Sequence, residues 1–264
     1  MNNIAFYIAQ IFRFIPKFNF ILNLPTQHRI LGKLQKFSKP RDKNYKAGNG
    51  YFLDKQVNNL SYISGIHEFE LLTKMHSYLK DGDTVIDIGA NAGTSILWLH
   101  HQKPQKQLSF IAFEALPYNA EIISNHLSLN PSVKCKVVAK ALGSEEGSIK
   151  FSTAGIGDGS AHAITDTIEN SNREIVEVEM TTLDKYYNNN EQPVSAILID
   201  VEGFGVEVLK GSLKTIEKYY PIIFIEIHDD KEKNGVTSIL ENLGYILKER
   251  IVDVYTHFVF VKSV

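Results

Sequence analysis

The sequence predicts a doubly wound α/β fold, in which helices cover both faces of a mostly parallel sheet. Short apolar runs alternate with segments whose apolar residues recur at helical spacing, as in βαβ units. Two of these runs, residues 195–199 and 221–227, are almost continuously apolar, which is typical of parallel strands buried on both faces. A glycine turn at residues 87–93 joins another run to a helical segment, where such sheets bind ligands.

The elements follow in a regular order from about residue 60. A helix is predicted over residues 68–79, where Leu71, Leu72 and Met75 share one face and Asp81-Gly82 ends the pattern. Further strands are predicted at residues 84–88, 108–113 and 133–138, with helices at 94–100, 118–129 and 206–216. Extra strands at 149–151 and 175–180 interrupt the alternation, and strands at 245–251 and 256–261 predict a C-terminal antiparallel hairpin.

Residues 1–59 are predicted to form an N-terminal helical extension, and residues 60–264 the α/β domain. The apolar, aromatic-rich segment at residues 4–15 is interrupted by Arg13 and Pro16, well short of the ~20 apolar residues that cross a bilayer. It also lacks the basic start and cleavage site of a signal peptide. We favour a helix that packs on the α/β domain or on a second copy of the chain in a homo-oligomer; the alternative is peripheral contact with a membrane.

Charge and cysteine content limit the classes of partner and compartment. The formal net charge is −2, from 28 basic and 30 acidic residues, and no block of Lys and Arg stands out. A nucleic-acid substrate is therefore disfavoured, because phosphate backbones require a basic surface. Cys135 is the single cysteine, which excludes an intramolecular disulfide and fits a reducing, cytoplasmic location.

The glycine turn reads Asp87-Ile-Gly-Ala-Asn-Ala-Gly93 and has Gly-x-x-x-Gly spacing. Dinucleotide-binding turns have Gly-x-Gly-x-x-Gly, whose middle glycine admits a pyrophosphate. Here Asp87 stands just before the turn, an unfavourable place for a phosphate and a favourable one for a cationic ligand. Glu114 follows the next strand, 27 positions later, where an acid can accept both hydroxyls of a ribose.

Two more pairs of polar residues stand at strand ends. Asp200 and Glu202 follow one strand, and Glu226 and His228 follow the next. Members of each pair are two residues apart, so in extended chain they point to the same side, and both strand ends open on the crevice beside Gly89. We expect this group to do acid–base chemistry rather than to bind a metal, since no third cluster of ligands is recognised. Helix capping and loop hydrogen bonds are the structural alternative for one or two of them.

Over residues 60 to 260 the chain resembles the FkbM family of methyltransferases, because six motifs appear in the order that they have in this family. They are Asp87-Ile-Gly-Ala-Asn-Ala-Gly93, Phe113-Glu-Ala-Leu-Pro117, Ala141-Leu-Gly143, Ile199-Asp-Val-Glu-Gly203, Leu209-Lys-Gly211 and Pro221-Ile-Ile-Phe-Ile-Glu226. The Asp-Val-Glu-Gly block followed by Leu-Lys-Gly is the most specific part. One departure is the Glu-Ala-Leu-Pro sequence at 114–117, where family members have Glu-Pro.

The resemblance implies a class I methyltransferase (Rossmann-like) sheet ending in an antiparallel hairpin, and S-adenosylmethionine as cofactor. It implies O-methylation of a hydroxyl on a small-molecule or carbohydrate substrate: a sugar, glycan or other natural product. The residues expected to bind the cofactor are Glu68, Asp87, Gly89, Asn91, Gly93, Glu114, Leu142 and Asp200.

Methyl transfer to a hydroxyl requires a group that accepts the hydroxyl proton. His228 is the expected general base, because an unperturbed imidazole titrates at about 6.5 and is neutral at working pH. Asp200 is the alternative base, and Glu202 and Glu226 complete the expected catalytic group. Two other functions stay open: a nucleotide-cofactor oxidoreductase of the NAD type, and a non-catalytic module that keeps the cofactor fold.

Overall fold

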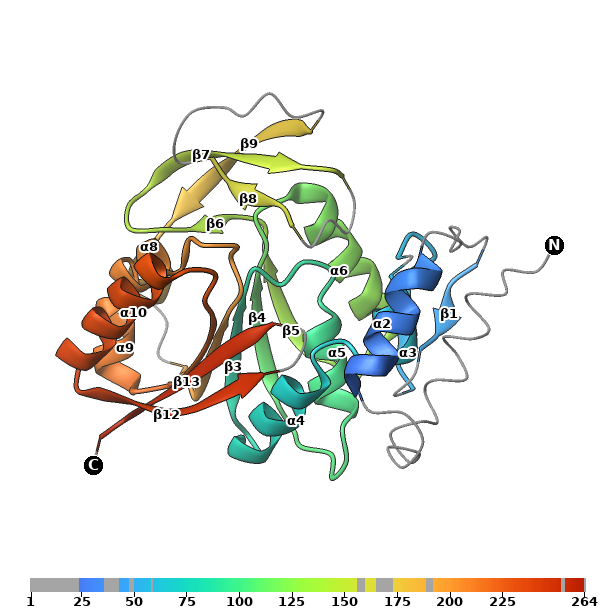
Figure 1. The fold of residues 1–264 in the computed structure, drawn as a ribbon, viewed down its shortest axis with the longest axis horizontal. Helices are drawn as coiled ribbons and strands as arrows, with labels where there is room; N and C mark the ends of the chain where they lie inside the picture. Colours follow the sequence, from blue (N-terminus) through green and yellow to red (C-terminus); the bar gives the residue numbers. More distant parts are fainter. Residues whose placement is uncertain are drawn as a thin grey trace.

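A seven-stranded sheet forms the centre of the protein, in the order β12-β13-β11-β10-β3-β4-β5 (Figure 1). The computed structural model describes residues 24–35, 43–47, 50–57, 59–155, 160–164, 173–188, 192–252 and 255–263. The apolar segment at residues 4–15 lies outside the described residues, as do residues 156–159 of the glycine-rich stretch at 155–160. The strands of the sheet are β3 (Thr84–Ile88), β4 (Ser109–Phe113), β5 (Lys134–Val138), β10 (Ala196–Ile199), β11 (Ile222–Glu226), β12 (Tyr245–Val252) and β13 (Thr256–Lys262).

Strand pairing confirms the predicted doubly wound topology. Five adjacent strands, β5, β4, β3, β10 and β11, run parallel to one another. The chain moves from β3 outward through β4 to β5 and then crosses back to β10 on the other side of β3. This switch point opens a crevice at the carboxyl ends of β3 and β10, where doubly wound sheets bind ligands. β13 pairs antiparallel with both β11 and β12, so the predicted C-terminal hairpin is confirmed.

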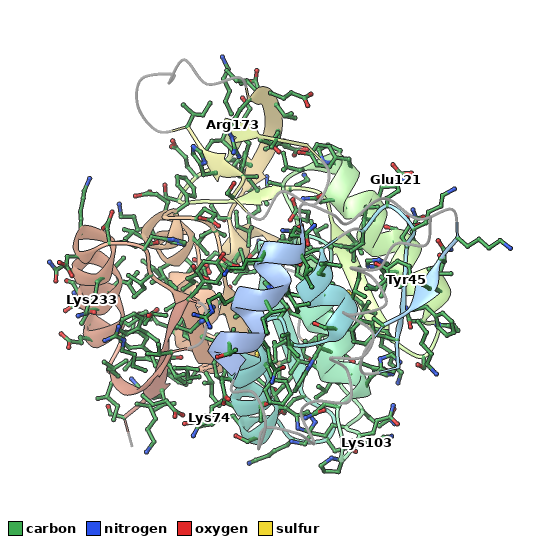
Figure 2. The ribbon with its side chains drawn as sticks, turned by 45° about the vertical axis from the view of Figure 1, so that its right-hand side comes forward. Tyr45, Lys74, Lys103, Glu121, Arg173 and Lys233 are labelled. Carbon is green, nitrogen blue, oxygen red and sulfur yellow. The ribbon has the colours of Figure 1, made fainter. Side chains whose placement is uncertain are left out.

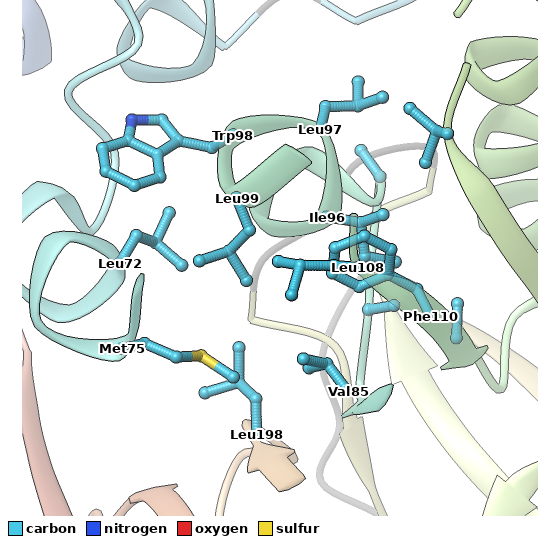
Figure 3. Close-up of a cluster of buried hydrophobic side chains, with 14 of the residues drawn as sticks. Leu72, Met75, Val85, Ile96, Leu97, Trp98, Leu99, Leu108, Phe110 and Leu198 are labelled. Carbon is cyan, nitrogen blue, oxygen red and sulfur yellow. The ribbon is translucent and has the colours of Figure 1, made fainter. Parts of the chain in front are cut away.

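Two helical layers cover the sheet. On one face are α4 (Phe69–Tyr78), α5 (Thr94–His101) and α6 (Pro117–Leu129), and on the other α8 (Gly205–Lys210), α9 (Leu213–Tyr219) and α10 (Asp230–Asn242). Successive side chains of a strand point to opposite faces of the sheet. In β3, Val85 packs against the first helical layer, and Ile86 and Ile88 pack against the second. Figure 3 shows the first layer, where Met75 and Leu99 approach Val85 and Leu198. Each such buried side chain stabilises the fold by about 1.5–3 kcal/mol.

The segment 206–216 differs from the prediction, because it forms two helices rather than one. α8 ends at Lys210, and α9 begins at Leu213. At the break, a β-carbon on Gly211 would lie 1.9 Å from the backbone oxygen of Gly143, so the two backbones touch there. The glycines of the Ala-Leu-Gly and Leu-Lys-Gly motifs therefore pack against each other.

A four-stranded sheet in the order β6-β9-β7-β8 lies over one edge of the crevice, at the top of Figure 1. The extra strands predicted at 149–151 and 175–180 are part of it. Its members are β6 (Ala141–Leu142), β7 (Gly147–Thr153), β8 (His162–Ala163) and β9 (Glu174–Thr181), and the short α7 (Leu183–Tyr187) follows. The hydroxyls of Tyr118 on α6 and Thr153 on β7 lie 2.7 Å apart and tie this sheet to the main layer.

The described N-terminal elements pack beside α5 and α6. They are α2 (Leu24–Gln35), β1 (Tyr45–Lys46), β2 (Phe52–Leu53) and α3 (Leu60–Ser64). Tyr51 and Leu53 belong to the same buried cluster as α5. The Asn130 side chain accepts a hydrogen bond from the backbone N of Phe52 at 2.9 Å and donates one to its oxygen at 2.8 Å.

Charged side chains are spread over the surface. The labelled Lys74, Lys103, Glu121 and Lys233 stand at separate points of the periphery in Figure 2. Among the helices that the structure describes, none has the length and apolar character needed to cross a bilayer.

Candidate active site

A pocket opens at the carboxyl ends of β3, β4, β10 and β11, at the switch point of the sheet. Its lining is rich in carboxyl groups: Glu68, Glu114, Asp200, Glu202 and Glu226 all contribute. Gly89, Asn91 and Leu142 also line it, as do several residues that the sequence does not single out, among them Tyr62, Asn119, Phe151, Phe204 and Tyr255. Asp87, Gly93 and His228 lie outside this lining.

The glycine turn is built around a close contact between two strand ends. Gly89 has φ +83°, and its N and that of Ala90 both donate to the Phe113 oxygen of β4, at 3.0 and 3.1 Å. A β-carbon on Gly89 would lie only 1.8 Å from the backbone oxygen of Asp200. Gly89 is therefore required by the approach of β10 as well as by the turn itself. Gly93, with φ +69°, is the N-cap residue of α5.

Glu114 joins the turn after β3 to the start of α6. Its Oε2 accepts a hydrogen bond from Asn91 N at 2.8 Å, and its Oε1 accepts one from Leu116 N at 2.9 Å. Burial nevertheless raises the pKa of Glu114 to about 7, although these bonds act in the opposite direction. Each carboxylate oxygen can accept a second hydrogen bond. The Asn119 side chain supplies one of these, which leaves room for a ribose hydroxyl.

Asp87 is buried beneath the turn. Its Oδ2 is buried without a hydrogen-bond partner among the described residues. Burial, then the charges of Glu68 and Glu114, raises the pKa of Asp87 to about 8. The carboxyl group therefore favours its protonated form, and it lies behind the lining of the pocket rather than in it.

Asp200, Glu202, Glu226 and His228, expected to share the crevice, are brought together. His228 stands between two of the acids: its Nδ1 lies 3.7 Å from Glu202 Oε2, and its Nε2 lies 3.5 Å from Glu226 Oε1. Its backbone N donates to Glu232 Oε2 at 2.9 Å, which anchors the loop after β11. The imidazole is partly accessible to solvent, whereas Glu226 is buried.

Burial raises the pKa of the Asp200 carboxyl well above its ordinary value, and Glu226, Glu68, Glu202 and Asp87 add to the rise in that order. Asp200 Oδ1 is also buried without a hydrogen-bond partner in the described part of the chain. Ionising these carboxyl groups together therefore costs free energy, and a cationic ligand would reduce that cost.

His257, at the start of β13, is a member of this cluster that the sequence analysis does not single out. It is fully buried and pairs with Glu226 across the two strands. Its Nε2 lies 3.3 Å from Glu226 Oε2 and 3.7 Å from Glu68 Oε1. The one sequence signal was a polar residue within an otherwise apolar strand; its partners depend on the antiparallel pairing.

The pocket suits a ligand that is positively charged at one end and apolar and aromatic at the other. Lys140 is the only Lys or Arg among the described lining residues, and its Nζ pairs with Glu179 outside the acid cluster. Leu142, Phe151 and Phe204 supply apolar surface in the same lining. S-adenosylmethionine, with its sulfonium, ammonium and adenine groups, fits a pocket lined by carboxyl groups and apolar side chains.

Comparison with known proteins agrees with the geometry. Residues 87–247, more than half of the chain, match the family model described as the methyltransferase FkbM domain. Among curated proteins, none matches the chain significantly. The family match favours a methyltransferase over the oxidoreductase alternative.

Several solved structures of methyltransferases are similar to the chain. The methyltransferase FkbM from Methylobacillus flagellatus KT has a TM-score of 0.50 at 16% identity, over 69% of this chain and 44% of that one. The chain thus spans less than half the length of that protein. A putative rRNA-methylase from Clostridium thermocellum has a TM-score of 0.48 at 13% identity, over 74% and 95% of the two chains. Precorrin-6y C5,15-methyltransferase from Geobacter metallireducens GS-15 has a TM-score of 0.46 at 12% identity, over 74% of this chain and 88% of that one.

The sheet order, the C-terminal hairpin and the first of these structures show a class I methyltransferase fold, whose known cofactor is S-adenosylmethionine. Together with the match over residues 87–247, they show that the chain belongs to the FkbM methyltransferase family.

Proposed function

We propose that this protein transfers the methyl group of S-adenosylmethionine to a hydroxyl of a sugar, glycan or other natural product. One observation carries the proposal: a solvent-accessible imidazole, His228, stands between two carboxyl groups beside an acid-lined cofactor pocket. A proton acceptor is needed for a hydroxyl nucleophile. The pocket itself is typical of a cationic cofactor.

The cofactor, when bound, supplies an electrophilic methyl group on a sulfonium. Glu114 is positioned to accept the ribose hydroxyls, because both of its oxygens are held by backbone N–H groups of the adjoining loops. Leu142 and Phe151 offer an apolar wall for the adenine. The carboxyl groups of Glu68 and Asp200, which line the pocket, would stabilise positive charge on the bound cofactor.

His228 would take the proton from the acceptor hydroxyl as that oxygen bonds to the methyl carbon and the bond from this carbon to the sulfonium sulfur breaks, with the neutral thioether as leaving group. The carboxylates of Glu202 and Glu226 lie on opposite ring nitrogens and stabilise the imidazolium that forms. Because the His228 ring is accessible to solvent, it can release this proton to water after each turnover. Asp200 is deeper in the cluster and is the alternative acceptor.

The test is transfer of an isotope-labelled methyl group from S-adenosylmethionine by the full chain to a panel of sugars, glycans and other hydroxyl compounds. Each hydroxyl acceptor is paired with its amino analogue, and the products are identified by the NMR shift of the labelled methyl. We expect methyl ethers. Label found only on nitrogen, carbon or carboxyl groups would contradict O-methylation while leaving the cofactor assignment intact.

A further inference from the structure

We propose that Glu68, Glu226 and His257 form a binding site for one divalent first-row transition-metal ion, such as Mn²⁺ or Zn²⁺. The three side chains come from the start of α4, the end of β11 and the start of β13. All three are buried, and one potential ligand atom from each lies within 4.8 Å of the others. Metal binding at this site does not depend on the identity of the methyl acceptor.

His257 is the observation that points to an ion rather than to a mere acidic cluster. The imidazole is fully buried and directed at two carboxylates, yet neither ring nitrogen makes a hydrogen bond within the described part of the chain. Burying an imidazole with both nitrogens unsatisfied costs free energy. Coordination of Nε2 to a cation satisfies one of them and also compensates the two buried carboxylates.

The distances favour a shared ion over a direct ion pair. A charge-assisted hydrogen bond between imidazolium and carboxylate is about 2.7–2.9 Å long. Nε2 of His257 is 3.3 Å from Glu226 Oε2 and 3.7 Å from Glu68 Oε1, which is longer. Two atoms bound to one tetrahedral ion at about 2.1 Å are separated by roughly 3.4 Å. The observed separations bracket that value.

The second oxygen of each carboxylate has its own partner, so both side chains are held in position. Glu226 Oε1 lies 3.5 Å from His228 Nε2. Glu68 Oε2 accepts a hydrogen bond from Ser95 Oγ at 3.5 Å and lies 3.8 Å from His67 Nε2. Outer partners of this kind orient ligand carboxylates in metal sites. One imidazole and two carboxylates suit Mn²⁺ and Zn²⁺ better than Mg²⁺ or Ca²⁺, which favour oxygen alone.

The two carboxylates also line the pocket, whereas His257 lies behind them. Three protein ligands would leave at least one coordination position open for a group bound in the pocket. An ion there would polarise a bound hydroxyl and lower the pKa of its proton. This role rests on the proposed function, whereas binding of the ion does not.

The experiment measures Mn²⁺ binding to the chelator-treated full chain, without cofactor, by electron paramagnetic resonance. We expect one ion per chain, with hyperfine coupling to one imidazole nitrogen. His257→Gln should weaken binding at least about 10–100-fold, the loss that removal of an outer partner alone causes. Glu68→Gln, which changes no buried volume, should do the same and keeps the test valid if His257→Gln fails to fold. His100→Gln, a buried histidine of α5 outside the pocket, should bind Mn²⁺ normally.

Three outcomes would overturn the proposal. The first is that the folded wild-type chain binds neither Mn²⁺ nor Zn²⁺, as expected if the cluster only receives the ammonium group of the cofactor. The second is that Glu68→Gln and His257→Gln bind the ion as tightly as the wild type. The third is that, of the variants, only His228→Gln abolishes binding, which would assign the ion to the neighbouring group of Asp200, Glu226 and His228.

Discussion

The backbone oxygen of Asp200 occupies the space where a side chain at Gly89 would begin, 1.8 Å from an ideal β-carbon. Gly89 also has a positive φ of +83°. We expect Gly89→Ala to destabilise the protein through both effects, whereas Gly82→Ala, with φ +88° and no atom within 4 Å of its β-carbon, tests the backbone strain alone.

The control substitution at Gly82 should cost about 1–2 kcal/mol, the ordinary price of a left-handed conformation with a side chain. Gly89→Ala should cost at least about 2 kcal/mol more, because either β3 or β10 must move. Denaturant unfolding measures both. Equal losses of stability would show that the approach of the Asp200 backbone does not constrain this position.

Much of this crevice was predictable, because local signals specify it. The strand at residues 84–88 and the hairpin at the end were found from apolar runs alone, and the parallel topology brings Asp200, Glu202, Glu226 and His228 to one edge. The requirement for Gly89 is predictable only in part. The sequence indicates a tight turn, but the contact with Asp200 depends on the pairing of β10 with β3.

Features that depend on contacts between distant parts of the chain are not predicted from the sequence. The break at Gly211 follows from its contact with Gly143, on an element far away in the chain. α10 was not predicted, because its apolar face is carried by few residues, chiefly Val236 and Leu240, among charged ones. His257 reaches Glu226 only through the antiparallel pairing of β13 with β11.

Asp87 should make the stability of the ligand-free protein fall as pH rises. Its pKa is raised from 3.8 to about 8 on folding, chiefly by burial. Between these values the folded chain retains a proton that the unfolded chain has lost, so stability is complete below the lower value and lost as pH approaches the upper one. The slope is at most about 1.4 kcal/mol per pH unit for this group.

Asp87→Asn is neutral at every pH and should show a smaller fall. Unfolding of both proteins at about pH 5 and about pH 8 measures the difference, with Glu121→Gln on the exposed face of α6 as a control. Identical slopes for the wild type and Asp87→Asn would mean that the carboxyl group is ionised in the folded chain.

His228→Ala should lower turnover about 10²–10⁴-fold, the usual effect of losing a general base, and leave cofactor affinity unchanged. Initial rates with a hydroxyl acceptor and calorimetry with the cofactor measure the two effects separately. His101→Ala, on α5 outside the pocket, is the matched control and should retain activity. Near-normal turnover in His228→Ala, together with collapse in Asp200→Asn, would transfer the role to Asp200.

Removal of residues 1–23, which precede α2, should leave cofactor affinity intact, because every proposed contact comes from residue 59 onward. We expect the deletion to change the oligomeric state or the binding to lipid vesicles, since the aromatic-rich segment needs a partner surface. Sedimentation and vesicle co-flotation compare the two proteins. Unchanged behaviour in both would leave the segment without a role in association.

Calorimetric titration with S-adenosylmethionine, its demethylated product and NAD tests the central claim most directly, since it asks what the acid-lined pocket binds. We predict that the first two bind and NAD does not. Glu114→Ala should weaken binding of both by about 1–3 kcal/mol, because buried hydrogen bonds to the ribose are lost, while Glu121→Ala binds like the wild type. Tight binding of NAD, or unchanged affinity for S-adenosylmethionine in Glu114→Ala, would contradict the account.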